Sequence, residues 1–288
     1  MQDLKNLLNF SLINIDKPSG PTSYSISEFI RRELGLKKTS HMGTLDPKVT
    51  GVLPITLGRA CKLAGYFIKH DKSYAGILHT HKEQNIKKLQ GLIDKYFSGK
   101  ILQIPPHRSA VKRAKRKREI YSWRLLEASE DGRDFLFECK VEGGTYIRKL
   151  CSDLGEMVGG AHMGELRRTM AGIFSEEKIY DLDEFESAVD EWKRRDDEKL
   201  RGMLVSAEDA IKEVLPVVQV EKRAIKSLWM GKPLFKGDVV GVHSFKDGEI
   251  FAAFCGKRFI GVYKRSNKVP SKIRTTKEVF GRSEFVCN

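Results

Sequence analysis

The spacing of apolar residues predicts a strand, a tight turn and a helix near the start of the chain. Leu12 to Ile15 form a short apolar run closed by DKPSGPTS, whose prolines and glycine disfavour regular structure. Apolar residues at helical spacing follow at Ile26, Phe29, Ile30 and Leu34. Ser25 and Glu28 match a capping box, and Gly35 stands where a helix commonly stops. We therefore expect a strand and a helix joined by a turn.

Strand patterns dominate the segment that follows. GVLPITLG, residues 51–58, is typical of a buried strand, and a short helix is expected from about Arg59. Ser73 to His81 alternate as a half-buried strand. One face of this strand carries Tyr74, Gly76, Leu78 and Thr80. The other face carries Ala75, Ile77, His79 and His81.

The rest of the first two thirds of the chain predicts a mixed fold. Four more elements are expected: a helix over 83–97, strands near 119–128 and 133–142, and a helix that opens near Thr145. Strands and helices do not alternate regularly, so a doubly wound parallel sheet is disfavoured. We expect an α+β domain over residues 1–214, with a mixed, largely antiparallel sheet and helices on its faces.

The pattern changes after Pro216 to short apolar runs separated by glycine turns. These runs are Val239 to Phe245, Glu249 to Phe254 and Phe259 to Tyr263. Short strands at such spacing are typical of a small β-barrel or sandwich. We therefore expect a second domain over residues 215–288.

The charge of the chain is large and unevenly placed. Its formal net charge at pH 7 is +14, from 52 Lys and Arg against 38 Asp and Glu. Residues 215–288 hold fifteen basic and six acidic side chains, whereas residues 175–213 hold seven basic and fourteen acidic ones. An excess of positive charge attracts polyanions. Nucleic acid is therefore the expected partner of the basic part, and the alternative is a basic surface without a partner. The acidic part is expected to be a solvated helix or connector.

Cysteines and apolar runs indicate the cellular setting. The five cysteines lie far apart without a C-x-x-C pair, at Cys61, Cys139, Cys151, Cys255 and Cys287. This spacing signals neither a zinc site nor a disulfide framework. The N-terminus is too polar for a signal peptide, and no run approaches the roughly 18 to 20 apolar residues that span a bilayer. We expect a soluble cytoplasmic protein without a membrane partner.

The densest candidate for chemistry is SHMGTLDPKVTG, residues 40–51. Gly43 and Pro47 favour an irregular backbone there. Asp46 stands before Pro47 and is held away from the helical conformation, which can project its carboxylate from a loop. A turn or capping aspartate is the plainer interpretation of an isolated Asp-Pro pair, and the segment alone leaves both interpretations open.

A second candidate is GGTYIRKL, residues 143–150. Two glycines before the expected helix allow a close approach of the backbone, and Tyr146 and Arg148 would project a hydroxyl and a guanidinium from its first turn. Arg148 either pairs with a surface acid or holds a buried carboxylate in its charged form, because an adjacent guanidinium lowers the pKa of a carboxyl group.

A third candidate is a basic run that follows Pro105 and Pro106. Seven of its eleven residues are basic: Arg108, Lys112, Arg113, Lys115, Arg116, Lys117 and Arg118. Such a run is often merely solvated, or is a localisation signal. The proline pair and the apolar Ala110 and Val111 favour an ordered loop that lies along a polyanion. We expect these side chains to bind RNA phosphates.

No motif for a metal or a nucleotide cofactor is present in the sequence. His79 and His81 share a strand face without an acid or cysteine nearby in sequence, so no metal site is assigned. The chain carries neither a Gly-rich P-loop nor a dinucleotide fingerprint. Both observations argue against a nucleotide-driven or redox enzyme.

Taken together, these segments resemble the TruB and dyskerin family of pseudouridine synthases. The matching pieces, in chain order, are INIDKPSGPTS, SHMGTLDPKVTGVLPITLG, KSYAG, IPPHRSAVKR, GGTYIRKL and GAHMGELRRT. They cover residues 11–174, and the segment after 216 is similar, less specifically, to the family's PUA RNA-binding domain. The resemblance implies an isomerase that turns a chosen uridine into pseudouridine without a metal or an organic cofactor.

The resemblance also implies roles for single residues. Asp46 matches the catalytic carboxylate, which attacks the sugar or assists there while the N-glycosidic bond breaks, the base rotates and C5 bonds to C1′. Tyr74 matches the tyrosine that stacks on the target base, which must leave its own stack to react. Arg148 matches the arginine that pairs with the aspartate, and Tyr146 the tyrosine beside it. Leu166 matches an apolar wall of the uracil pocket.

Two further positions carry an implied role, and four depart from the family pattern. Lys17 and His41 match positions that shape the pocket and handle the flipped RNA. The departures are Tyr24, where histidine is common, Ser40 and Met42, where glycine is frequent, and His107 within the PPHRSAVKR segment. They concern the fine shape of the pocket.

The implied substrates and partners are RNA and RNA-guided complexes. RSAVKR and GTLDPKVTG are similar to the archaeal and eukaryotic branch, which implies a box H/ACA guide RNA, small box H/ACA proteins and ribosomal RNA. The short segment before the first strand favours a compact archaeal-type protein, with a guide-independent role on uridine 55 of the tRNA T-loop left open. The rival is a non-catalytic RNA-binding or assembly protein of the same fold. We favour catalysis, since a binding relic needs none of Asp46, Tyr74 and Arg148.

Overall fold

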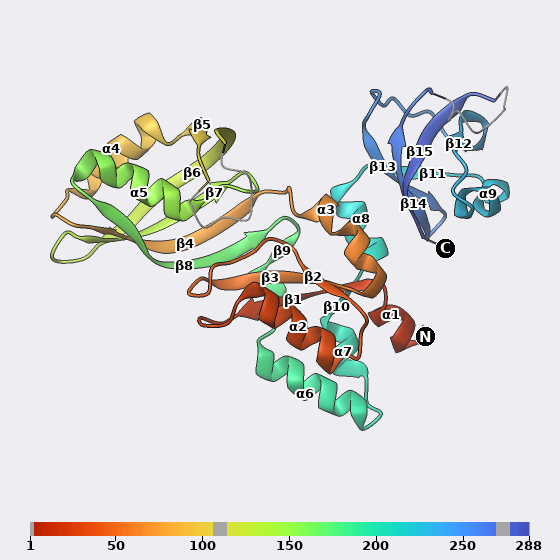
Figure 1. The fold of residues 1–288 in the computed structure, drawn as a ribbon, viewed down its shortest axis with the longest axis horizontal. Coiled ribbons are helices and arrows are strands. Elements are labelled where there is room, and N and C mark those ends of the chain that lie inside the picture. The colour runs from red at the N-terminus through yellow and green to blue at the C-terminus, as the bar shows by residue number, and fades with distance from the viewer. Residues whose placement is uncertain (1–2, 106–113, 269–276, 288) are drawn as a thin grey trace. The chain divides into compact units, whose positions relative to one another are not determined.

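The chain forms two compact units, Met1–Leu204 and Val205–Asn288. The computed structural model describes residues 3–105, 114–268 and 277–287 (Figure 1). The division falls one helix before the boundary expected after residue 214, because α8 lies in the second unit. Among the described residues, no helix has the length and apolarity needed to cross a membrane.

The first unit contains most of the helices and strands. In chain order they are α1 (Leu4–Leu8), β1 (Ser11–Lys17), α2 (Ser23–Glu33), β2 (Thr39–His41), β3 (Thr50–Leu57), the 3-10 helix η1 (Gly58–Leu63), α3 (Ala64–Phe67), β4 (Lys72–Thr80), α4 (Ile86–Tyr96), β5 (Gly99–Gln103), β6 (Arg116–Ala128), β7 (Asp134–Val141), α5 (Ile147–Val158), β8 (Ala161–Ala171), β9 (Phe174–Ser175), η2 (Glu176–Lys178), α6 (Leu182–Lys193) and α7 (Glu198–Met203). The short strand β10 (Leu204–Ser206) follows at the division between the units.

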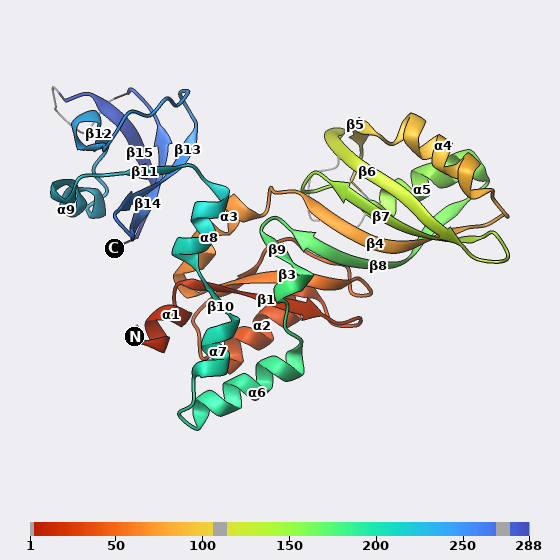
Figure 2. The ribbon, with the colours of Figure 1, turned by 180° about the vertical axis from the view of Figure 1, so that it is seen from behind.

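The main feature of the first unit is one large mixed sheet, in which the strand order is β1-β3-β8-β4-β7-β6-β5. Neighbours in this order are antiparallel except β3 and β8, which run parallel where Thr50 and Gly51 lie opposite Arg167 and Arg168. Two antiparallel halves therefore meet at a short parallel junction. Helices α4 and α5 cover the half with β4, β6 and β7, and α2 and α6 lie by the half with β1 and β3 (Figures 1 and 2). The expected α+β class is confirmed.

The buried core follows the predicted alternation. On β4, Tyr74, Leu78 and Thr80 are buried, whereas the residues on the other face of the strand are partly exposed. The same face continues on β7 with Phe135 and Phe137, which are fully buried. Burial of such apolar side chains is the main favourable contribution to folding, about 25 cal/mol per Å². The aromatic side chain of Tyr74 thus belongs to the buried core of this unit.

The start of α2 differs from the prediction. The N-cap is Thr22, whose Oγ1 accepts a hydrogen bond of 3.0 Å from the backbone N–H of Ser25. Glu28 instead forms an ion pair with Arg31. The predicted capping box of Ser25 and Glu28 is therefore wrong, because Thr22, directly after Pro21, supplies the capping oxygen earlier.

The second unit is built on a smaller sheet. Its elements are α8 (Ala207–Val214), β11 (Val217–Gln219), η3 (Lys222–Ala224), α9 (Ile225–Trp229), β12 (Leu234–Phe235), η4 (Lys236–Asp238), β13 (Ile250–Cys255), β14 (Arg258–Arg265) and β15 (Val279–Val286). The strand order is β11-β13-β14-β15-β12, and the sheet curls into a half-barrel. The strands predicted near 249–254 and 259–263 are present as β13 and β14.

The third predicted strand of this unit, Val239 to Phe245, is wrong. Only Val239 makes a bridge, to Val220. Gly241 has a φ of +83° and Val242 is fully exposed, so the backbone turns away from the sheet despite its β-branched residues.

Candidate active site

A cavity of about 640 Å³ lies beside the parallel junction of the large sheet. The β2–β3 loop, β4, β8 and the start of α5 supply its walls. Six of the seven residues expected at the substrate site line it: His41, Asp46, Tyr74, Tyr146, Arg148 and Leu166. Segments more than 120 positions apart in sequence therefore meet in one cavity.

Asp46 and Arg148 form an ion pair inside this cavity. Nη2 of Arg148 lies 2.9 Å from Oδ2 of Asp46, and the two side chains are 50% and 45% exposed. Arg148 thus pairs with the predicted carboxylate, which is half-exposed rather than buried. Charge-assisted hydrogen bonds of this kind fix the orientation of a carboxylate. The pair presents an oriented, accessible carboxylate to a ligand in the cavity.

The loop that carries Asp46 is fixed by its backbone. The hydroxyl of Ser23 donates to the carbonyl of Leu45 at 3.1 Å and accepts from the N–H of Leu45 at 2.8 Å. The N–H of Gly20 donates to the carbonyl of Pro47 at 3.0 Å, and that of Val49 to the carbonyl of Asp46 at 3.0 Å. The KPSGPTS turn therefore holds both sides of the catalytic candidate. Ser23 was not singled out from the sequence, although it belongs to that motif.

Lys17 supports the same loop from within the protein. Its side chain is fully buried, and its Nζ donates to the carbonyls of Pro18, Pro47 and Val49 at 2.8 to 2.9 Å. Burial lowers the pKa of Lys17, and the charge of Asp46 opposes this shift. Lys17 does not line the cavity, so the structure places it as a brace for the Asp46 loop.

Arg168 joins the loop to the sheet. It is 1% exposed, and its guanidinium donates to the carbonyls of Val52 at 2.7 Å and Gly43 at 3.0 Å. It also lies opposite Tyr74 in the pairing of β4 with β8, where its positive charge acts on the phenol. Gly43 has a φ of +97°, and a Cβ there would lie 3.2 Å from Nη1 of Arg168. Only glycine allows this approach without strain.

Tyr74 and Leu166 form the apolar part of the cavity. Both side chains are 7% exposed. Burial raises the pKa of the Tyr74 phenol, and the positive charge of Arg168 opposes that shift. The ring is therefore a neutral, fixed aromatic surface at neutral pH. Such a surface suits stacking on a nucleobase.

His41 lies at the cavity wall near the Asp46 loop. Its Nε2 is 3.0 Å from Oγ1 of Thr44. Burial lowers the pKa of His41, and the positive charge of Arg168 lowers it further. The ring therefore favours its neutral form, which can donate and accept hydrogen bonds.

Lys72 is a cavity residue that was not singled out from the sequence, although it opens the KSYAG motif. It is 6% exposed, and its Nζ donates to the carbonyls of Ile68 and His70 at 2.8 Å each. Burial lowers its pKa to about 8, and the charge of Arg168 contributes to the shift. A cation at the cavity wall thus titrates near physiological pH.

Tyr146 is positioned through its backbone. The side chain of Gln103, which is buried, accepts from the N–H of Tyr146 at 2.8 Å and donates to its carbonyl at 3.0 Å. Nε of Arg118 donates to the carbonyl of Gly144 at 3.0 Å. Gln103 and Arg118 therefore fix the GGTYIRKL segment at the start of α5. Neither role could be read from the sequence, because both depend on contacts between distant segments.

The predicted phosphate-binding run is only partly described. Arg108, Lys112 and Arg113, together with His107, lie outside the described residues. Lys115 and Lys117 are exposed, and Arg116 is the first residue of β6. Their binding to RNA stays a prediction, and Arg118 is engaged with the chain's own carbonyl.

Three histidines gather at the far end of β4. The rings of His79 and His162 lie 4.9 Å apart, and those of His81 and His162 lie 5.4 Å apart. Nδ1 of His79 lies 2.7 Å from Oδ1 of Asp134. No group of three or more metal-ligating side chains within the described ranges is arranged to hold a metal ion.

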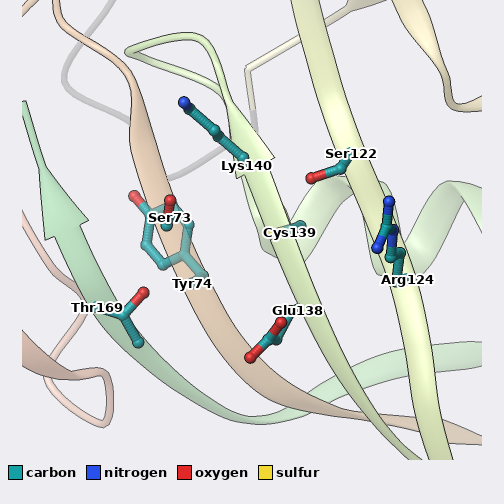
Figure 3. A pocket seen from close by; sticks show the side chains of 8 residues that line it. All are labelled: Ser73, Tyr74, Ser122, Arg124, Glu138, Cys139, Lys140 and Thr169. Carbon is teal, nitrogen blue, oxygen red and sulfur yellow. The ribbon is translucent and has the colours of Figure 1, made fainter.

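A smaller hollow of about 280 Å³ lies over β4, β6, β7 and β8 (Figure 3). Its lining includes the hydroxyls of Ser73, Ser122 and Thr169 and the charged side chains of Glu138 and Lys140. Tyr74 contributes to both cavities, but Asp46 and Arg148 line only the larger one. The larger cavity is therefore the candidate active site.

Comparison with known proteins agrees with this geometry. The model of the TruB family pseudouridylate synthase N-terminal domain matches residues 31–147, and that of the tRNA pseudouridylate synthase B C-terminal domain matches residues 148–212. A probable tRNA pseudouridine synthase B of Korarchaeum cryptofilum is 43% identical over 249 residues, which cover 85% of this chain and 75% of that protein. Another, of Methanopyrus kandleri, is 42% identical over 246 residues, covering 84% and 72%.

The chain belongs to the TruB family of pseudouridine synthases. It is accordingly an isomerase. The predicted resemblance is confirmed, and it extends beyond the segment on which it was based.

Solved structures of TruB-family complexes share the fold. A crystal structure of a Cbf5-Nop10-Gar1 complex contains a chain that is 35% identical, with a TM-score of 0.88 over 99% of this chain and 87% of the other. An H/ACA ribonucleoprotein bound to a substrate RNA with 2′-deoxyuridine contains one that is 32% identical, with a TM-score of 0.86 over 99% and 87%.

Proposed function

We propose that this TruB-family synthase isomerises uridine in RNA, at uridine 55 of the tRNA T-loop and, as the catalytic subunit of a box H/ACA guide ribonucleoprotein, in ribosomal RNA. The observation that carries the proposal is the Asp46–Arg148 ion pair of 2.9 Å in the same cavity as Tyr74 and Leu166. A non-catalytic RNA-binding protein would have no need of this oriented carboxylate. The named relatives and the ribonucleoprotein structures support the two kinds of RNA.

Each cavity residue has a place in this reaction. Asp46 acts at the sugar, either by bonding to it or by taking a proton from it, and Arg148 holds the carboxylate charged and oriented. Tyr74 stacks on the uracil ring, Leu166 forms an apolar wall, and Tyr146 lies beside the pair. The isomerisation needs no external electron donor or acceptor, because uridine and pseudouridine have the same composition and oxidation level.

The second unit serves as an RNA-docking domain of the PUA type in this proposal. Residues 215–288 carry fifteen basic against six acidic side chains. The curled five-stranded sheet is consistent with that class. Small box H/ACA proteins, as in the complex with Nop10 and Gar1, are the expected partners in the guided reaction. All five cysteines are free thiols, which suits the reducing cytoplasm.

Release of tritium from RNA labelled at uridine C5 tests the proposal, because the C5 hydrogen is lost when C5 bonds to C1′. The purified protein is incubated with a tRNA transcript alone, and with ribosomal RNA plus guide RNA and partner proteins. Release in the first reaction supports a stand-alone tRNA enzyme, and release in the second supports the guided role. Absence of release in both reactions would refute the proposed function.

A further inference from the structure

The active-site cavity holds more positive than negative charge. Among the described residues that line it, Asp46 is the one acidic side chain, and it is paired with Arg148. Lys72 and Arg168 also line the cavity, and they are 6% and 1% exposed. Within the part of the chain that the structure describes, neither forms an ion pair with a carboxylate. Two buried cations therefore have no carboxylate within ion-pair distance among the described residues, and only the charge of Asp71, beside Lys72 on the chain, partly offsets that of Lys72.

The two cations lie next to each other beside Tyr74. A Cβ at Gly43 would be 3.2 Å from Nη1 of Arg168 and 3.4 Å from Cε of Lys72, so both side chains approach the same point. Lys72 precedes Tyr74 by two residues on β4 and is buried on the same face of that strand. Arg168 on β8 lies directly opposite Tyr74 in the pairing of β4 with β8. The positive charges of Lys72 and Arg168 therefore lie on the side of the cavity that Tyr74 lines.

This arrangement is costly to maintain. Burial of a charge without a charged partner disfavours the folded state, since water solvates ions better than a protein interior does. Backbone carbonyls replace part of that solvation, those of Ile68 and His70 for Lys72 and those of Gly43 and Val52 for Arg168. Carbonyl dipoles leave the net charge in place. The cavity therefore has a fixed positive potential before any ligand binds.

The reaction supplies a negative charge that a uridine substrate lacks. When the C1′–N1 bond breaks, its electron pair passes to N1, and the detached uracil becomes an anion whose charge spreads over its ring and carbonyl oxygens. This holds whether Asp46 bonds to the sugar or takes a proton from it. The charge leaves the ring when C5 donates a pair to C1′, as Asp46 leaves the sugar or returns the proton that it took. C5 then loses its proton and N1 takes up one, which gives neutral pseudouridine. Fixed cations beside the ring favour the transition state over the neutral substrate.

We propose that Lys72, together with Arg168, stabilises the negative charge that develops on uracil as the glycosidic bond breaks. Asp46 and the sugar then lie at one end of the breaking bond, and the cation pair lies at the other. The inference rests on the proposed function, specifically on uracil stacking against Tyr74.

Substitution of Lys72 tests the role of its charge. Lys72→Met removes the charge and keeps a long side chain, Lys72→Arg keeps the charge, and Lys69→Met is the matched control because Lys69 is exposed and does not line the cavity. We expect Lys72→Met to lower the single-turnover rate about a hundredfold with RNA affinity nearly unchanged. Lys72→Arg should recover most of the rate, and Lys69→Met should match wild type. A normal rate in a folded Lys72→Met protein would overturn the inference.

A leaving-group experiment separates electrostatics from a structural role. Fluorine at C5 withdraws electrons and makes the uracil anion more stable, so 5-fluorouridine depends less on the enzyme's cations. The rate of glycosidic-bond cleavage is measured by nucleoside chromatography for RNA with uridine or 5-fluorouridine at the target. The ratio of the fluorinated to the natural rate should rise in Lys72→Met relative to wild type. An equal loss on both substrates would contradict the inference, because misfolding or misplacement affects both alike.

The pH profile gives an independent test. The charges that act on Lys72 are those of Arg168 on β8 and of Asp71 beside it on the chain. The other titratable or charged groups that line the same cavity are His41, Asp46, Tyr74, Tyr146 and Arg148. Since the pKa of Lys72 is about 8, kcat/KM of wild type should fall above that pH as the ammonium loses its proton. Lys72→Arg should remove this fall, because arginine stays charged. An unchanged fall in Lys72→Arg would overturn the assignment, whereas a wild-type protein without any turnover refutes the proposed function itself.

Discussion

The position of the Asp46 carboxylate depends on side chains outside its own loop. Lys17 and Ser23 bind backbone atoms on both sides of Asp46. The resemblance implied a pocket role for Lys17, and the structure places it behind the Asp46 loop. Two of its three acceptors are carbonyls thirty or more residues away in sequence, and no local pattern reveals them. Asp46 itself could be predicted because an Asp-Pro pair within a glycine-containing motif has a family precedent.

Lys72 predicts a particular dependence of stability on pH. Its pKa is about 8 in the folded protein, against 10.5 in an unfolded chain. Between these values the unfolded chain holds a proton at Lys72 that the folded protein lacks, so the free energy of unfolding rises with pH in this window. The rise from Lys72 should be about 3 kcal/mol.

Denaturant unfolding of wild type and Lys72→Met at several pH values isolates this contribution from those of other titrating groups. Relative to Lys72→Met, wild type should gain stability from pH 8 to 10.5. A constant difference between the two proteins would show that Lys72 keeps an ordinary pKa.

At the scale of elements, local sequence patterns predicted individual helices and strands, but not which distant strands pair. The alternation on β4 and the glycines before α5 predict those elements closely. The parallel pairing of β3 with β8 joins segments more than 110 residues apart, and β8 contains Gly164 and the pair Arg167 and Arg168, which hide its alternation. The run from Val239 to Phe245 predicted a strand that the structure lacks, because its β-branched residues have no partner strand.

The parallel junction itself should tolerate no side chain at Gly51. Its φ is +97°, and a Cβ there would lie 2.3 Å from the carbonyl oxygen of Arg168. Gly51→Ala should therefore lower the free energy of unfolding by about 1–3 kcal/mol or more, and it should reduce turnover because Arg168 also holds the Asp46 loop. Gly65→Ala is the matched control, since Gly65 has open space around it. Equal stability of both variants in urea unfolding would contradict the close packing at the junction.

At the scale of the whole molecule, composition identified the class of partner and the number of compact units. The +14 net charge and its concentration after residue 215 indicate a polyanion. Charge counts cannot identify the docking surface, because that depends on which side chains the fold exposes. The identity of the active site likewise required the fold, since its walls come from four separate segments.

Salt dependence of RNA binding tests whether the second unit carries the RNA footprint. Lys222, Lys226 and Lys232 are exposed in this unit, and replacing all three with Gln should flatten the slope of log Kd against log salt by up to about two. The matched control replaces Lys178, Lys193 and Lys199 with Gln. This triple change removes the same amount of positive charge from the acidic segment, residues 175–213. If both triple variants change the slope equally, net charge and not a localised footprint governs binding.

The most direct test of the account is single-turnover tritium release by Asp46→Asn, with Asp153→Asn as control. Asp153 is a partly exposed carboxylate that pairs with Lys149 on α5, and it does not line the cavity. The account predicts that Asp46→Asn binds RNA with nearly wild-type affinity and releases no tritium above background, whereas Asp153→Asn releases it at the normal rate. Turnover by Asp46→Asn close to that of wild type would contradict the central claim that this carboxylate performs the chemistry.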